Sequence, residues 1–146
     1  MAYFANPQYW AGLFDGEGNI GLIPSGNKNG ERYLQVRIQL CGNYKPTIQT
    51  LADIFQVNVL HEKRQPMMNK FALVGKKAVA FLEEILPFLK EKEIQARYAI
   101  QFQYGRTRYN GGCKRGISED ELAWRTMHKE LIKLENQRYK YHRWKG

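Results

Sequence analysis

The clearest alternation of apolar and polar residues runs from Arg32 to Cys41. Side chains of a strand point to opposite faces in turn, so this alternation predicts a strand with one buried and one polar face. The expected buried face consists of Leu34, Val36, Ile38 and Leu40. The expected polar face consists of Tyr33, Gln35, Arg37 and Gln39. A shorter alternation over residues 19–24 predicts a preceding strand, with a turn at 25–30.

Apolar residues at helical spacing predict a helix over residues 8–15, which Asn6 caps and Pro7 opens. Further helices are expected from Pro46, over 76–86, over 94–104, and from a capping box at Ser118 to about residue 141. Two strands, near 57–64 and 70–74, should be joined by a turn at Pro66. The last helix shows an apolar stripe of Trp124, Met127, Leu131 and Leu134, and its His128 is expected at the surface.

The order of these elements is α-β-β-α-β-β-α, followed by a helical tail. Two hairpins separated by a helix predict an α+β fold with one antiparallel sheet and helices on one of its faces. The other face would be open to solvent or to a ligand. The 146 residues fit a single domain with a core over about 6–104, a basic loop over 105–117 and a C-terminal helix over 118–141.

Charge indicates the kind of partner. Lys and Arg number 23 against 14 Asp and Glu, which gives a net charge of +9 and a pI near 9.6. Residues 97–146 hold 12 of the basic residues and 5 of the acidic ones. This balance favours a polyanionic partner, with a merely solubilising surface as the alternative. No apolar run is long enough for a membrane span, the first residues do not resemble a signal peptide, and two cysteines are too few for a disulfide framework. We therefore expect an intracellular protein that does not bind membranes.

Two segments carry a resemblance to a known family. Trp10-Ala11-Gly12-Leu13-Phe14-Asp15-Gly16-Glu17-Gly18 resembles the nine-residue LAGLIDADG motif, and residues 86–96 resemble a second segment of the LAGLIDADG homing endonucleases. The resemblance covers about residues 8–104 and contains one motif, as in the homodimeric members. It implies an intron-encoded, site-specific endonuclease that lays a saddle-shaped sheet on a long pseudo-palindromic DNA duplex. It also implies a location in a chloroplast or mitochondrion, or in the cytoplasm of a prokaryote, where the gene could belong to a phage.

Other activities remain open. A member of this family that has lost cleavage can act as an intron RNA maturase or as a repressor, so intron RNA is a second partner to consider. A basic ribosomal or other RNA-binding protein would explain the charge but not the two motif segments.

Two glycines predict a helix contact. Gly12 and Gly16 lie four residues apart, on one helical face, and a face without side chains lets a second helix approach closely. The resemblance implies that this second helix belongs to another copy of the chain, with Leu13 also in the interface. From the residues alone, the glycines could equally make room within one subunit.

The resemblance assigns Glu17 as the catalytic acid and metal ligand, together with Gly18. Two copies of Glu17 side by side would repel each other unless a cation lay between them. Mg²⁺ suits oxygen ligands and phosphodiester hydrolysis. Mn²⁺ should substitute for it, and Ca²⁺ should bind without supporting cleavage. Asp15 is expected to have a structural role at the end of the helix, with metal contact as the alternative.

Lys92 matches a lysine that lies near the scissile phosphate in this family, where a cation can stabilise developing negative charge. Lys90 is the alternative, and a solvated surface lysine between Glu91 and Glu93 is the default reading without the resemblance. The family often has a polar residue such as Gln after the second strand. Gly42 occupies that position here, which makes the neighbouring Asn43 the candidate for ordering the attacking water.

The polar strand face is the candidate DNA surface. Gln and Arg side chains bond the edges of adenine and guanine, and a two-stranded ribbon fits the major groove. An ordinary water-facing sheet is the alternative. Four further residues could extend the surface from the second hairpin, although weak alternation leaves their facing open. They are His61, Lys63, Arg64 and Lys70.

Overall fold

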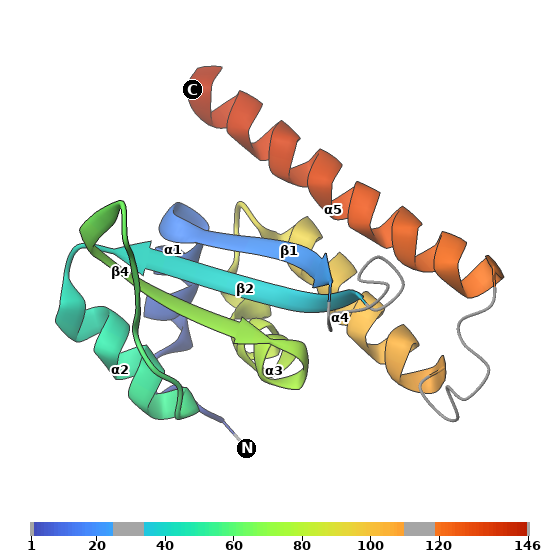
Figure 1. Cartoon of the computed structure of the whole chain (residues 1–146). Coiled ribbons are helices and arrows are strands. Elements are labelled where there is room, and N and C mark those ends of the chain that lie inside the picture. Colours follow the sequence, from blue (N-terminus) through green and yellow to red (C-terminus); the bar gives the residue numbers. More distant parts are fainter. Residues whose placement is uncertain (1, 25–33, 110–118, 146) are drawn as a thin grey trace.

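The computed structural model describes residues 2–24, 34–109 and 119–145. The elements follow one another as α1 (Pro7–Glu17), β1 (Gly18–Pro24), β2 (Leu34–Gly42), α2 (Lys45–Phe55), β3 (Leu60–Glu62), β4 (Gln65–Val74), α3 (Gly75–Ile85), the short 3₁₀ helix η1 (Leu86–Phe88), α4 (Glu93–Tyr109) and α5 (Glu119–Lys145). The strands form one antiparallel sheet in the order β1-β2-β4-β3. This arrangement confirms the predicted α+β fold and its element order (Figure 1).

The predicted alternation of β2 is confirmed. Leu34, Val36, Ile38 and Leu40 are fully buried, whereas the residues between them are partly exposed. In β4, Phe71 and Leu73 are buried on the same face. In Figure 1 the strands lie in front of α1, α3 and α4, which pack on this buried face. The opposite face of the sheet is here called the open face, and the β2 residues that point to it are partly exposed.

Aromatic rings join the elements of the core. Phe81 of α3 lies 5.4 Å from the ring of Phe14 in α1 and 6.0 Å from that of Phe71 in β4. It also contacts Phe4 before α1 and Phe55 at the end of α2. Edge-to-face and tilted ring pairs of this kind add to the free energy of burial. The core thus fixes α1, the helix that carries the motif, against both the sheet and α3.

The second hairpin differs from the prediction. The turn comprises Lys63 and Arg64, and Pro66 lies inside β4. The pairing of β4 with β2 begins at Asn69, so residues 65–68 of β4 have no partner in β2. The missing N–H of Pro66 therefore breaks no hydrogen bond with β2. At the other end of β4, Gly75 has φ of 62°, a conformation that favours glycine, and this residue turns the chain into α3.

The predicted basic loop begins later than expected, because α4 continues to Tyr109. Residues 110–118, including the predicted capping residue Ser118, lie outside the described residues. In α5 the buried side differs from the predicted apolar stripe. Met127 and Leu134 are about half exposed, whereas Glu121, Arg125, His128 and Ile132 are buried. Arg125 Nε donates to Glu121 Oε1 at 2.8 Å, so a paired charge replaces the apolar residues that the pattern predicted.

Helix α5 binds both α4 and the sheet. The ring of Trp124 stacks on Phe102 of α4 at 5.5 Å, and Gly105 allows this approach, since a Cβ there would meet the Trp124 ring at 2.3 Å. Further along, Asn136 Nδ2 donates to the backbone oxygen of Ile20 at 2.9 Å. Figure 1 shows α5 running beside β1, so this helix protects the free edge of the sheet. No helix within the described ranges is long and apolar enough to cross a membrane.

Candidate functional site

Asp15 organises the chain just before α4. Its buried carboxylate accepts hydrogen bonds from the backbone N–H groups of Lys90 at 2.8 Å, Glu91 at 3.2 Å and Lys92 at 3.0 Å. A negative charge at this place also complements the dipole of α4. The predicted structural role of Asp15 is confirmed, and this carboxylate ties α1 to a segment more than seventy residues later.

Lys92 lies against the end of α1. Its ammonium group donates to the backbone carbonyl of Asp15, and the side chain is only 5% exposed. This burial excludes the interpretation of Lys92 as a solvated surface lysine. A buried ammonium group needs hydrogen-bond acceptors, and the carbonyl of Asp15 is one. Lys90, the alternative candidate, is exposed. The structure therefore holds the Lys92 ammonium group at the carbonyl of Asp15, which is two residues before Glu17.

Glu17 is the last residue of α1 and is exposed. Gly18 follows as the C-cap, and its N–H bonds to the carbonyl of Phe14. A Cβ at Gly18 would lie 2.2 Å from the Phe14 ring, so no larger residue fits without moving this ring. The parts of the chain that the structure describes contain no cluster of three or more His, Cys, Asp or Glu side chains. The end of α1 thus offers the exposed Glu17 carboxylate, with backbone carbonyls beside it, to a hard cation.

The end of β2 meets the same region. Gly18 pairs with Leu40, so Gly42 and Asn43 lie just beyond the first residue of β1, beside the end of α1. Asn69 Nδ2 donates to the carbonyl of Gly42 at 3.2 Å and that of Asn43 at 3.5 Å, while the Asn43 side chain is exposed. Asn69 is a buried polar residue that the sequence did not reveal, because no local pattern distinguishes it from a surface Asn. It positions the turn that carries Asn43.

The outer face of α1 is open. A Cβ built at Gly12 or at Gly16 meets nothing within 4 Å. Leu13, in contrast, is partly buried against the core. Each glycine makes the helix about 1 kcal/mol less stable than alanine would. No side chain among the described residues occupies the space beside these glycines, so the described part of the subunit does not account for this cost.

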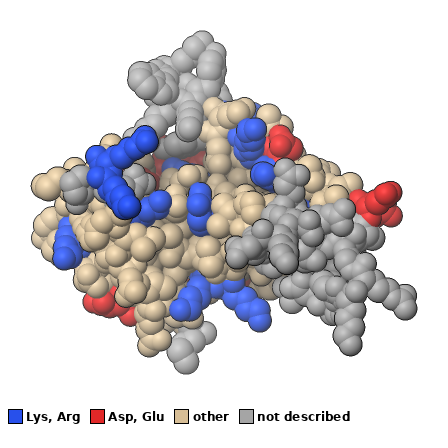
Figure 2. Space-filling model, viewed as in Figure 1, with Lys and Arg blue, Asp and Glu red and all other residues tan. Residues whose placement is uncertain are grey.

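The open face of the sheet carries the other candidates. Eleven of the described residues have a printed strand partner that fixes them on this face, and none of these eleven is acidic. They are Asn19, Gly21, Ile23, Gln35, Arg37, Gln39, Cys41, Leu60, Lys70, Ala72 and Val74. Figure 2 shows Lys and Arg side chains over the middle of this view and acidic ones toward its margins. The structure thus places Lys70, whose facing the sequence left open, on the same face as Gln35, Arg37 and Gln39.

The remaining predicted contacts are placed differently. His61 pairs with Asn69, so it points to the opposite side of the sheet from Arg37. Lys63 and Arg64 are exposed in the turn between β3 and β4. Tyr33 lies outside the described residues. The hairpin therefore offers two basic residues at its tip rather than a continuous polar face.

No protein-family model matches the sequence, and no curated protein matches it. Solved structures do match. The homing endonuclease I-CvuI, crystallised with an uncleaved DNA target in the presence of Mg, superposes with a TM-score of 0.70 at 20% identity over 89% of this chain and 81% of its own. The homing endonuclease I-TnaI gives a TM-score of 0.58 at 16% identity over 91% of this chain and 97% of its own. This chain has the fold of the LAGLIDADG homing endonucleases.

Within this LAGLIDADG fold, the two segments that carry the sequence resemblance are in direct contact through Asp15 and Lys92. The meganuclease I-SmaMI, solved bound to DNA, matches with a TM-score of 0.67 at 11% identity over 86% of this chain. That match covers 44% of I-SmaMI. A single copy of this chain is therefore equivalent in fold to about half of the larger nuclease.

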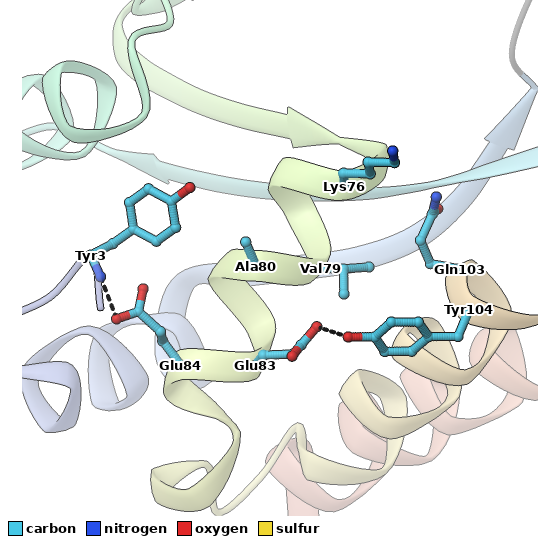
Figure 3. A pocket seen from close by; sticks show the side chains of 8 residues that line it. All are labelled: Tyr3, Lys76, Val79, Ala80, Glu83, Glu84, Gln103 and Tyr104. Atoms are coloured by element: carbon cyan, nitrogen blue, oxygen red, sulfur yellow. Dashed lines mark hydrogen bonds between the residues drawn. The ribbon is translucent and has the colours of Figure 1, made fainter. Parts of the chain in front are cut away.

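A pocket of about 350 Å³ lies on the helical side, among Tyr3, α3 and α4 (Figure 3). Glu84 Oε1 accepts from the backbone N–H of Tyr3 at 2.6 Å, and Glu83 Oε1 accepts from the Tyr104 hydroxyl at 2.6 Å. The latter bond raises the pKa of Tyr104. Both carboxylates thus hold neighbouring segments together, and the pocket is separated from the open face by the sheet.

Proposed function

We propose that this protein is a site-specific DNA endonuclease that hydrolyses phosphodiester bonds as a homodimer with a divalent metal ion. The observation that carries the proposal is that the exposed Glu17 carboxylate and the buried Lys92 ammonium, which donates to the carbonyl of Asp15, lie at the same end of α1. These two groups border the open face, whose described candidate contacts include Arg37 and Lys70, in a protein with a net charge of +9. The likeness to homing endonucleases that were solved with DNA supports the choice of substrate.

The proposed homodimer rests on the glycine face of α1, which no described residue of the same subunit covers. The open glycine face of α1 suits a second α1 related by two-fold symmetry, and such an interface uses the same patch on both copies. It would bring two Glu17 carboxylates close together. A cation between them would relieve their mutual repulsion, and the described residues of one chain form no cluster of three or more possible ligands by themselves.

Each residue at the end of α1 has a separate task. Glu17, together with the carbonyl of Gly18, would hold the metal ion, and Mg²⁺ is the best match to these oxygen donors. When bound, the ion supplies an activated water and stabilisation of the leaving oxygen. Lys92 stabilises negative charge on the phosphate, and Asn43 orients water from the end of β2. Arg37, Gln35, Gln39 and Lys70 contact the duplex from the open face.

The test is cleavage of a library of long random DNA duplexes in Mg²⁺, Mn²⁺ or Ca²⁺. We expect defined cuts with the first two ions, and binding without cuts in Ca²⁺. Glu17→Gln should bind the selected site without cutting it, because an amide is a poor Mg²⁺ ligand of nearly the same shape. Glu130→Gln, the same change at an exposed position of α5, is the matched control. Near-normal cleavage by Glu17→Gln would remove this residue from the site.

One observation keeps a second function in view. Gly42 has no side chain where a polar residue could help to order water, although the backbone there has room for one, with Ile48 3.8 Å from a Cβ. A nucleic-acid-binding protein that does not cleave, such as an intron RNA maturase, would tolerate this glycine. Tight binding of structured intron RNA, with no DNA cleavage in any metal ion, would favour this second function.

A further inference from the structure

Two large apolar side chains lie on the open face. Leu60 pairs with Lys70, and Val74 pairs with Arg37, so both share the face of the candidate DNA contacts. Leu60 is 47% exposed and Val74 is 45% exposed. Side chains directly opposite each other in an antiparallel pair are only about 5 Å apart at Cβ. Each exposed apolar residue therefore lies beside a cation.

This arrangement differs from an ordinary water-facing sheet. A sheet with one solvated face places polar residues on that face. The end of β4 instead reads Phe71-Ala72-Leu73-Val74, which is apolar on both faces, as in strands that are covered on both sides. Since Phe71 and Leu73 fill the core, Ala72 and Val74 are left for an external partner.

The chemistry of the face selects the partner. Exposed apolar residues beside cations suit a surface that is negatively charged yet presents apolar groups. The major groove of DNA has this character, because the 5-methyl group of thymine is its apolar feature and small apolar side chains contact it. We propose that Val74 and Leu60 recognise thymine methyl groups and so help to determine the target sequence. The proposal rests on the proposed binding of DNA by the open face.

The two residues should read different base pairs. Val74 lies four residues along β4 from Lys70, the partner of Leu60, which corresponds to about 13 Å of strand at 3.3 Å per residue. Successive bases of one DNA strand are about 3.4 Å apart. The two side chains thus cannot reach the same thymine.

The experiment begins with a duplex selected by binding to the full-length wild-type protein in Ca²⁺. Each thymine is then replaced singly by uracil, which removes the methyl group and leaves the hydrogen-bonding edge unchanged. Loss of one buried methyl group should weaken binding about fourfold, from about 0.8 kcal/mol per group. We expect such a loss at separate thymines for Val74 and for Leu60.

Variants assign each effect to a side chain. Val74→Asn should bind thymine and uracil equally at one position, and Leu60→Asn should do so at another, while the remaining positions keep the wild-type response. Leu134→Asn, the same change at a 53% exposed residue of α5, should leave every uracil effect unchanged. Comparing all four combinations isolates the coupling between side chain and methyl group.

The possible outcomes separate the two proposals. Sequence-specific binding with no uracil effect, or with effects that persist in both variants, overturns methyl recognition and leaves the endonuclease proposal standing. Absence of any duplex binding by the wild-type protein overturns both. Uracil effects that disappear only with the matching variant support the assignment of Val74 and Leu60.

Discussion

The open glycine face of α1 gives a prediction in which the sign of the effect is decisive. In an isolated subunit, Gly12→Ala adds a methyl group to empty space, since nothing lies within 4 Å of it. It should therefore stabilise the folded monomer by about 1 kcal/mol through helix propensity alone. In a dimer built on this face, the same methyl group would hold two helices apart.

The expected cost to the dimer follows from symmetry. Overpacking at a tight contact costs about 1–3 kcal/mol, and a two-fold interface contains each substitution twice. The dimer should thus be weakened by at least about 2 kcal/mol, or roughly thirtyfold in the dissociation constant.

Sedimentation equilibrium over a range of protein concentrations, without DNA, measures this constant, and urea unfolding at low concentration measures the monomer. Gly21→Ala is the matched control, because it also adds a methyl group to open space, but on the sheet. An unchanged dissociation constant for Gly12→Ala, together with a more stable protein, would refute an interface through this face of α1.

Three further predictions concern the fold and the DNA surface. Asp15→Ala removes an acceptor from three backbone N–H groups and should lower the free energy of unfolding by about 3 kcal/mol or more, measured in urea. Gly105→Ala forces a Cβ to within 2.3 Å of the Trp124 ring and should loosen α5, which amide hydrogen exchange would report as faster exchange in this helix than in α1. Arg37→Ala should relax sequence preference by about 1–3 kcal/mol at one base pair, measured with single-base variants of the site. A uniform loss on all sequences with a reduced salt slope would instead mark Arg37 as a phosphate contact.

Local periodicity predicted those parts of the fold in which one face is buried by apolar side chains. The alternation of β2 and the helix start at Asn6 and Pro7 are clear because each follows from the chain's own geometry. The buried side of α5 could not be found in this way. There, Arg125 and Glu121 satisfy each other and are buried as a pair, although each residue type alone indicates an exposed position.

Pro66 shows a related limit. A proline between two short apolar runs suggests a turn, yet the sheet tolerates it where β4 extends beyond its neighbour β2. Which residues of a strand lack a partner on one side depends on the lengths of other strands. Sequence spacing near the proline contains no information about those lengths.

The candidate site depends on contacts that are still more distant in the sequence. Between Glu91 and Glu93, Lys92 has the local pattern of an exposed lysine, and only the family resemblance singled it out. The structure shows the physical reason, because Asp15 and Lys92 hold each other through two separate contacts. The carboxylate of Asp15 gathers the N–H groups of the segment before α4, and this turn directs the Lys92 ammonium back to the carbonyl of Asp15. The acid of the first motif segment thereby positions the lysine of the second, while Glu17 remains exposed at the helix end. A change at Asp15 should therefore impair the chemistry assigned to Lys92, because the three backbone donors that this carboxylate accepts from hold the segment that directs the Lys92 side chain.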